Sequence, residues 1–88
     1  MKILHLVRCP KENYPFEIAG LQSREGGHEV TVVLLQDAVM SGHPAVDGVA
    51  VFSGHEDLDA RGLPAIGGTL DYDGIVKKIF EADRIINW

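Results

Sequence analysis

Cysteine is almost absent from this sequence, whose 88 residues include a single one, Cys9. One thiol cannot form an internal disulfide, and a lone cysteine is typical of a reducing compartment. Long hydrophobic runs are also missing, since no apolar stretch approaches the ~20 residues of a membrane span. The N-terminal MKILHLVRCPK is too short and too soon interrupted for a signal peptide. We therefore expect a cytoplasmic protein without a membrane segment.

Positive charge is scarce as well. Eight Lys and Arg against thirteen Asp and Glu give a formal net charge of −5, which argues against direct nucleic-acid binding. The composition, 45% hydrophobic and 24% charged, is that of a globular domain rather than a disordered chain. Residues 1–88 suffice for one small domain, and small domains bury little of their surface. We therefore expect association with other subunits.

The stretch that organises the chain is 29–40, EVTVVLLQDAVM. Its nearly continuous apolar run, 30–35, predicts a strand buried on both sides, as in a parallel sheet covered by helices. Gln36 and Asp37 would then lie at the carboxyl end of that strand, with Asp37 capping a short helical turn. Ligands and partners bind at this edge of open α/β sheets.

Further strands are predicted over 2–7, 48–52 and 83–88, with a loop over 63–69. Helices are predicted over about 15–25, 54–61 and 72–82. Asp71 should cap the last helix, and its buried stripe should comprise Ile75, Val76, Ile79 and Phe80. The order predicts a three-layer α/β domain with a mostly parallel sheet of about four strands and helices on both faces.

Cys9 is the first candidate for chemistry, because it follows the first strand and is flanked by Arg8 and Lys11. Adjacent cations favour the thiolate, which is the nucleophilic form of cysteine. The alternative is that Cys9 is a small apolar residue of the core.

Ser53 ends the third strand, with His55 two residues on. A capping box formed with Glu56 explains Ser53 better than a nucleophilic role, and no G-x-S-x-G elbow is present. The histidines, His5, His28, His43 and His55, lack the spacing of metal ligands. A phosphate-binding glycine loop is also missing after the first strand. We therefore expect neither a metal nor a cofactor.

Several segments together resemble the DsrE/DsrF/DsrH family of sulfur-relay proteins, and most of all its DsrH or TusB-like branch. They are KILHLVR, VTVVLLQDAV, GVAVFSGHEDLDARGL and DYDGIVKKIFEADRIINW, and they follow in this order over nearly the whole chain. The Leu-Leu-Gln-Asp-Ala-Val motif is 34–39, the Asp-Leu-x-Ala-Arg-Gly motif is 57–62, and the closing helix and strand are 72–88.

The resemblance implies a flavodoxin-like α/β fold and a subunit that passes, or helps to pass, persulfide sulfur between proteins. The pathway would be tRNA 2-thiouridine synthesis or sulfur oxidation. Partners would be copies of the chain, or DsrE- and DsrF-like (TusD- and TusC-like) subunits, together with a sulfur donor and an acceptor protein.

The carrier cysteine of DsrE or TusD follows the third strand, where this chain has Ser53. Two interpretations therefore stay open: a sulfurtransferase component that uses Cys9, stabilised by Arg8 and Lys11, or a structural subunit without chemistry. A small metal- or ligand-binding protein is a third. In each, the carboxyl edge with Gln36, Asp37, Ser53 and His55 is expected to face partners.

Overall fold

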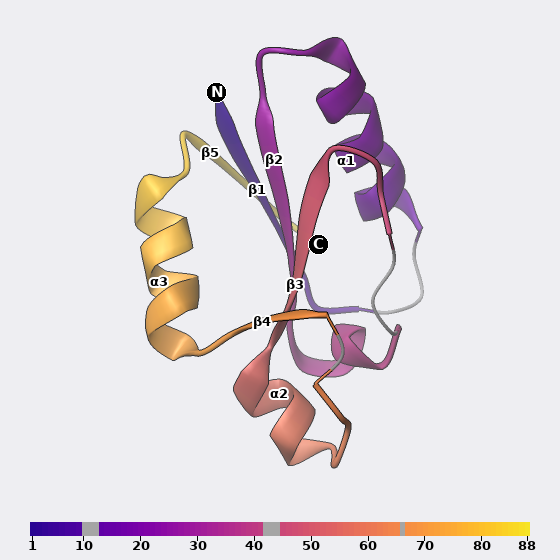
Figure 1. The fold of residues 1–88 in the computed structure, drawn as a ribbon, viewed down its shortest axis with the longest axis vertical. Helices are drawn as coiled ribbons and strands as arrows, with labels where there is room; N and C mark the ends of the chain where they lie inside the picture. Colours follow the sequence, from indigo (N-terminus) through magenta and orange to yellow (C-terminus); the bar gives the residue numbers. More distant parts are fainter. Residues whose placement is uncertain (10–12, 42–44, 66) are drawn as a thin grey trace.

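The sheet is parallel throughout and has the strand order β4-β3-β2-β1-β5 (Figure 1). The computed structural model describes residues 1–9, 13–41, 45–65 and 67–88, and five strands lie within them. Their bounds are β1 Lys2–Val7, β2 Glu29–Leu34, β3 Val49–Gly54, β4 Gly68–Leu70 and β5 Arg84–Asn87. The expected single α/β domain is confirmed, with one strand more than predicted.

β2 is the central strand and the best buried one. Every residue of Val30–Leu34 is buried, and β1 and β3 flank the strand in register from Ile3↔Val30 and Val30↔Val49 onward. A run of β-branched residues favours extended backbone, and because its one polar side chain is Thr31, the strand requires cover on both faces. The sequence-based prediction of an inner strand here is confirmed.

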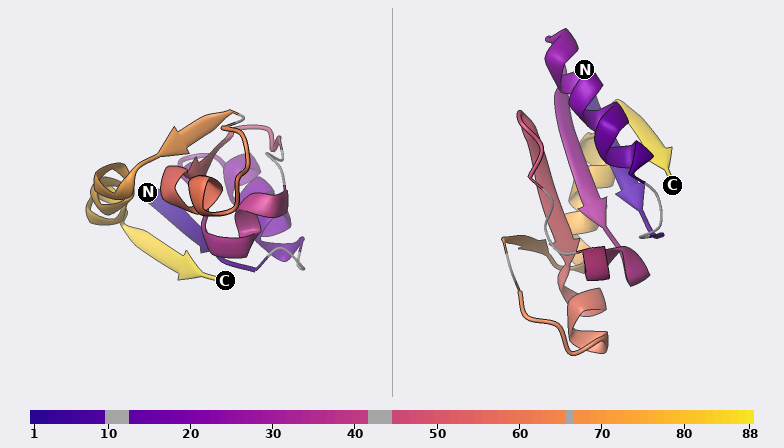
Figure 2. Two further views of the ribbon diagram at one scale, coloured as in Figure 1. Left: turned by 90° about the horizontal axis from the view of Figure 1, so that it is seen from below. Right: turned by 90° about the vertical axis from the view of Figure 1, so that its right-hand side faces the viewer.

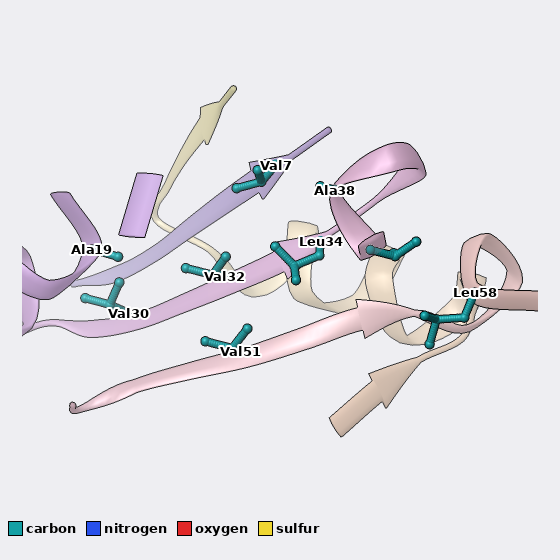
Figure 3. Packing of buried hydrophobic residues seen from close by; sticks show 9 residues of the cluster. Val7, Ala19, Val30, Val32, Leu34, Ala38, Val51 and Leu58 are labelled. Carbon is teal, nitrogen blue, oxygen red and sulfur yellow. The ribbon is translucent and has the colours of Figure 1, made fainter. Parts of the chain in front are cut away.

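Helices cover both faces of the sheet (Figure 2). The helix α1 (Tyr14–Glu25), the 3₁₀ helix η1 (Gln36–Ser41) and α2 (His55–Ala60) lie on one face, and α3 (Tyr72–Glu81) lies on the other. The core of the first face, drawn in Figure 3, consists of Val7, Ala19, Val30, Val32, Leu34, Ala38, Val39, Val51 and Leu58. On the second face Leu4, Leu6 and Val33 are buried, and Ile75 and Ile79 of α3 pack against them.

Local signals set most helix ends where the sequence predicted them. Pro15 lies in the first turn of α1, and Gly26, with φ 78°, ends that helix in a conformation that favours glycine. Asp71 caps α3, because its Oδ1 accepts a hydrogen bond from the Gly74 backbone at 2.8 Å.

The expectations for β4, for the start of α2 and for the buried stripe of α3 were wrong. β4 lies at Gly68–Leu70, partly inside the predicted loop. The prediction missed this strand because three residues are too few to show a periodic pattern. Ser53 does not cap α2: β3 extends to Gly54, which is the N-cap and makes no side-chain capping bond. Phe80 is 84% exposed rather than part of a buried stripe, and no described residue of α3 is fully buried.

No helix among the described residues is both long and apolar enough to cross a membrane.

Candidate functional site

The carboxyl ends of the strands gather the predicted site residues at one edge of the sheet. Because all strands run parallel, β1 leads into Arg8 and Cys9, β2 into Leu35 and Gln36, and β3 into His55 at the same edge. In α/β sheets this is the edge at which ligands bind.

Cys9 is exposed and free, so its thiol is accessible. The neighbouring Arg8 turns toward β5: its backbone N–H donates to the Trp88 carbonyl, and its Nη2 donates to Asn87 Oδ1, each at 3.4 Å. The second predicted cation, Lys11, lies outside the described residues. The accessible thiol therefore has one described neighbour that can offer positive charge.

Gln36 and Asp37 are both exposed at the end of β2. Gln36 has φ 50°, the one positive value among the described non-glycine residues, and this left-handed turn leads from the strand into η1. Such a conformation costs of order 1–3 kcal/mol and persists where the surroundings hold it.

Asp37 was expected to cap a helical turn but instead lies inside η1 and binds Arg61. Arg61 donates from Nη2 and Nε to Asp37 Oδ1 at 2.9 and 3.1 Å. Its Nη1 donates to the Asp57 carbonyl at 3.1 Å. One guanidinium therefore joins η1 to the end of α2.

Ser53 and His55 do not form a nucleophile and base pair. Ser53 is only 2% exposed, which does not fit its expected place on a partner-facing surface. His55 begins α2, is exposed, and places its Nε2 3.2 Å from Asp59 Oδ2. A serine-hydrolase mechanism needs a base directed at the serine, whereas the His55 side chain is directed at Asp59 of its own helix. The structure therefore does not support Ser53 as a nucleophile.

A cavity that sequence reasoning missed lies between α2 and α3 at the same edge. Its volume is about 190 Å³, and it is lined by Leu35, Gly54, Glu56, Asp57, Leu70, Tyr72 and Ile75. Gly54 leaves room for it, since a Cβ there would lie 2.7 Å from Asp57 Oδ2 and 3.2 Å from Leu35 Cδ2. The missed β4 supplies Leu70, so the sequence offered no signal for this wall.

Within the part of the chain that the structure describes, no three His, Cys, Asp or Glu side chains come close enough together to hold a metal ion. His43 lies outside the described residues.

His5 lies on β1 and is buried in the interior of the domain. Its side chain is fully buried, and burial lowers its pKa below the ordinary value of 6.5, against the opposing effect of a hydrogen bond with Gln22. Because its side chain is buried and is held by hydrogen bonds to Gln22 and Trp88, we interpret His5 as a structural residue.

Comparison with known proteins shows the fold. No protein-family model matches the chain, and no curated protein matches it. Among solved structures, the crystal structure of the ychN protein from E. coli superposes with a TM-score of 0.80 at 17% sequence identity. The match covers 100% of this chain and 99% of that one, so the two share the same α/β fold over their whole length.

Proposed function

We propose that the chain is a small sulfur-relay subunit that passes persulfide sulfur between proteins. The observation that carries the proposal is an exposed, solitary thiol, Cys9, at the carboxyl edge of a parallel sheet. Two further points support it: the ordered motifs resemble the DsrE/DsrF/DsrH family, and the fold is the one that this resemblance implied.

In the proposed transfer, the Cys9 thiolate attacks the outer sulfur of a donor protein's persulfide. A bond forms between Cys9 Sγ and that sulfur, the donor's S–S bond breaks, and the donor leaves as a thiolate with the electron pair. An acceptor thiolate then repeats the reaction on Cys9. Nothing is oxidised or reduced overall, so no cofactor is needed. Arg8 and Lys11 would stabilise the anionic persulfide.

A second candidate function is that of a structural subunit without chemistry. The observation that favours it is Ser53, which stands where DsrE and TusD have their carrier cysteine and is buried. In this case Cys9 would be a bystander, and the chain would act by shaping its complex.

Intact mass spectrometry after incubation with polysulfide or a persulfidated donor separates the two candidates. The wild type should gain ~32 Da, one sulfur, which a reductant removes. Cys9→Ser should gain nothing. The double variant Cys9→Ser/Ser53→Cys moves the thiol to the buried position and should also stay unmodified. A wild type that gains no mass, while its iodoacetamide labelling is slow, would favour the structural subunit.

We also propose that the chain works as an oligomer with itself or with DsrE- and DsrF-like subunits. The support is a small domain with large apolar side chains on its surface, among them Phe80 and Tyr72 at 84% and 67% exposure. Sedimentation at micromolar concentration should show at least a dimer for the homomeric case. A stable monomer that also fails to bind such subunits would contradict this.

A further inference from the structure

The negative charge of the chain is concentrated at the end that holds the cavity. Segments 36–41 and 53–75, called the acidic end below, contain six of the thirteen acidic residues and one of the eight Lys and Arg residues, Arg61. The remaining seven acidic and seven basic residues balance, so the formal charge of these two segments alone equals the net charge of −5; Arg8, after β1, is the described basic residue that follows a strand at the same edge. The acidic residues are Asp37, Glu56, Asp57, Asp59, Asp71 and Asp73.

The cavity at this end is lined by apolar residues and by two acidic ones. Leu35, Leu70 and Ile75 are apolar lining residues, and Glu56 and Asp57 are the acidic ones. Asp57 has Arg61 Nη1 at 3.8 Å, but none of the ion pairs among the described residues includes Glu56. The lining therefore includes one acidic residue, Glu56, that has no ion-pair partner among the described residues, together with apolar side chains.

A long side chain with a cationic tip suits both kinds of lining residue. Lysine can bury its aliphatic stem along apolar surface while its ammonium stays in water, where the acidic lining residues would attract it. The volume of about 190 Å³ exceeds the ~30 Å³ share of a single water several times over, so it admits a stem of this kind. Tyr72, which also lines the cavity, adds a ring on which a cation can rest.

The spread of charge points to a protein rather than to a small amine. Asp37 lies on η1, Asp59 on α2 and Asp73 on α3, so the field covers more surface than a small ligand could contact. A field of one sign on this scale accelerates the encounter with a partner of opposite charge.

We propose that the acidic end is a docking surface for a basic segment of a partner protein, and that one lysine of this segment anchors in the cavity. The inference deepens the proposed function and rests on it for the existence of a donor or acceptor protein. It assigns that partner a chemistry, a lysine-bearing surface, which the relay reaction itself does not require.

The test uses peptides that separate the stem from the charge. The probe is the acetylated and amidated heptapeptide Gly-Lys-Gly-Lys-Gly-Lys-Gly, titrated into the ¹⁵N-labelled full chain by NMR. One control peptide carries norleucine for lysine, which keeps the stem and loses the charge. The other carries 2,3-diaminopropionic acid, which keeps the charge and shortens the stem. The amides of Leu35, Gly54, Leu70 and Ile75 should shift with the lysine peptide, and both controls should bind at least about fivefold more weakly.

Matched variants locate the contact. Glu56→Lys and the cavity-filling Ile75→Trp should each weaken the lysine peptide by about fivefold or more. Asp47→Lys makes the same charge change on an exposed residue before β3, at the opposite edge of the sheet, and should leave binding within about twofold. Circular dichroism on each variant verifies that it is folded.

Several results would overturn the proposal. Equal binding of the diaminopropionate peptide would reduce the surface to a diffuse acidic patch, and equal binding of the norleucine peptide would remove the role of charge. Shifts elsewhere, no shifts, or equal weakening by Asp47→Lys would also reject it. Because the peptides contain no sulfur, Cys9→Ser should bind them like the wild type. The peptide titration therefore tests docking separately from sulfur transfer to Cys9, and either proposal can fail without the other.

Discussion

The indole Nε1 of Trp88 donates a hydrogen bond to Nδ1 of His5 at 3.0 Å, joining residues 83 positions apart. Since Nδ1 accepts, the proton of the neutral ring resides on Nε2, which donates to Gln22 Oε1 at 2.7 Å. The His5 and Trp88 rings also stack, with centroids 6.2 Å apart and an interplanar angle of 16°. Strand β1, helix α1 and the residue after β5 are thus joined through one neutral imidazole.

This arrangement predicts that the protein loses stability in mild acid. The folded state lowers the His5 pKa below 6.5, so the unfolded chain takes up this proton first as the pH falls. The free energy of unfolding contributed by His5 is therefore complete above pH 6.5 and decreases below it. Urea unfolding at about pH 7.5 and about pH 5.5, followed by fluorescence of Trp88, measures the loss.

His5→Gln is the control for this effect, because it removes the titrating group and leaves the other histidines and the acids in place. Its unfolding free energy should depend less on pH over the same interval than that of the wild type. Equal pH dependence in both proteins would assign the loss to other groups.

Replacing Gly48 should lower the free energy of unfolding for two reasons, backbone strain and a steric clash. It has φ 74°, and a Cβ there would collide with Oγ of Ser23 on α1. Gly26 has φ 78° with nothing within 4 Å of its Cβ position, so it isolates the strain. Gly26→Ala should cost about 1–3 kcal/mol, because φ 78° with ψ 162° is a conformation that is essentially confined to glycine. Gly48→Ala should cost at least about 1 kcal/mol more, because Ser23 must move. Equal losses in urea unfolding would mean that Ser23 adapts freely.

Arg61 should matter more to stability than its partner Asp37. The Asp37 side chain is 62% exposed, and pairs of this kind contribute about 0–1 kcal/mol. Arg61 also donates to the Asp57 carbonyl, so Arg61→Ala should cost about 0.5–1.5 kcal/mol beyond Asp37→Ala. Urea unfolding of the two single variants makes the comparison. A greater loss in Asp37→Ala would contradict the role given to Arg61.

The sequence predicted those parts of the fold that depend on local patterns. The apolar run of β2, Pro15 in the first turn of α1 and the Asp71 cap are all read from a few adjacent residues, and all were confirmed. The prediction that Ser53 caps α2 was wrong, because Ser53 pairs with Leu34 in the sheet and β3 therefore extends past it. The S-x-x-E pattern does not account for this pairing between strands. Tertiary pairing decided the end of that element.

For the candidate site, the sequence predicted which edge of the sheet its residues occupy but not the cavity. Parallel strands placed Cys9, Gln36 and Asp37 where expected, because the carboxyl ends of such strands share one edge. The cavity was not predictable, since Leu70 comes from a three-residue strand and Gly54 owes its place to the extended β3. The bond between Asp37 and Arg61 spans 24 residues and follows from packing rather than from spacing.

Ile79 and Phe80 give the last prediction, because these neighbours on α3 differ in burial. Ile79 packs on Leu4, Leu6 and Val33, whereas Phe80 is 84% exposed. Ile79→Ala should therefore lower the unfolding free energy of the monomer by about 1–2 kcal/mol, less than a fully buried residue would. Phe80→Lys should change it by no more than about 0.5 kcal/mol. If α3 contributes to self-association, Phe80→Lys should lower the sedimentation coefficient of the assembly, since burying a lysine in an apolar contact is costly. A Phe80→Lys variant that unfolds as readily as Ile79→Ala would show instead that Phe80 packs within its own domain.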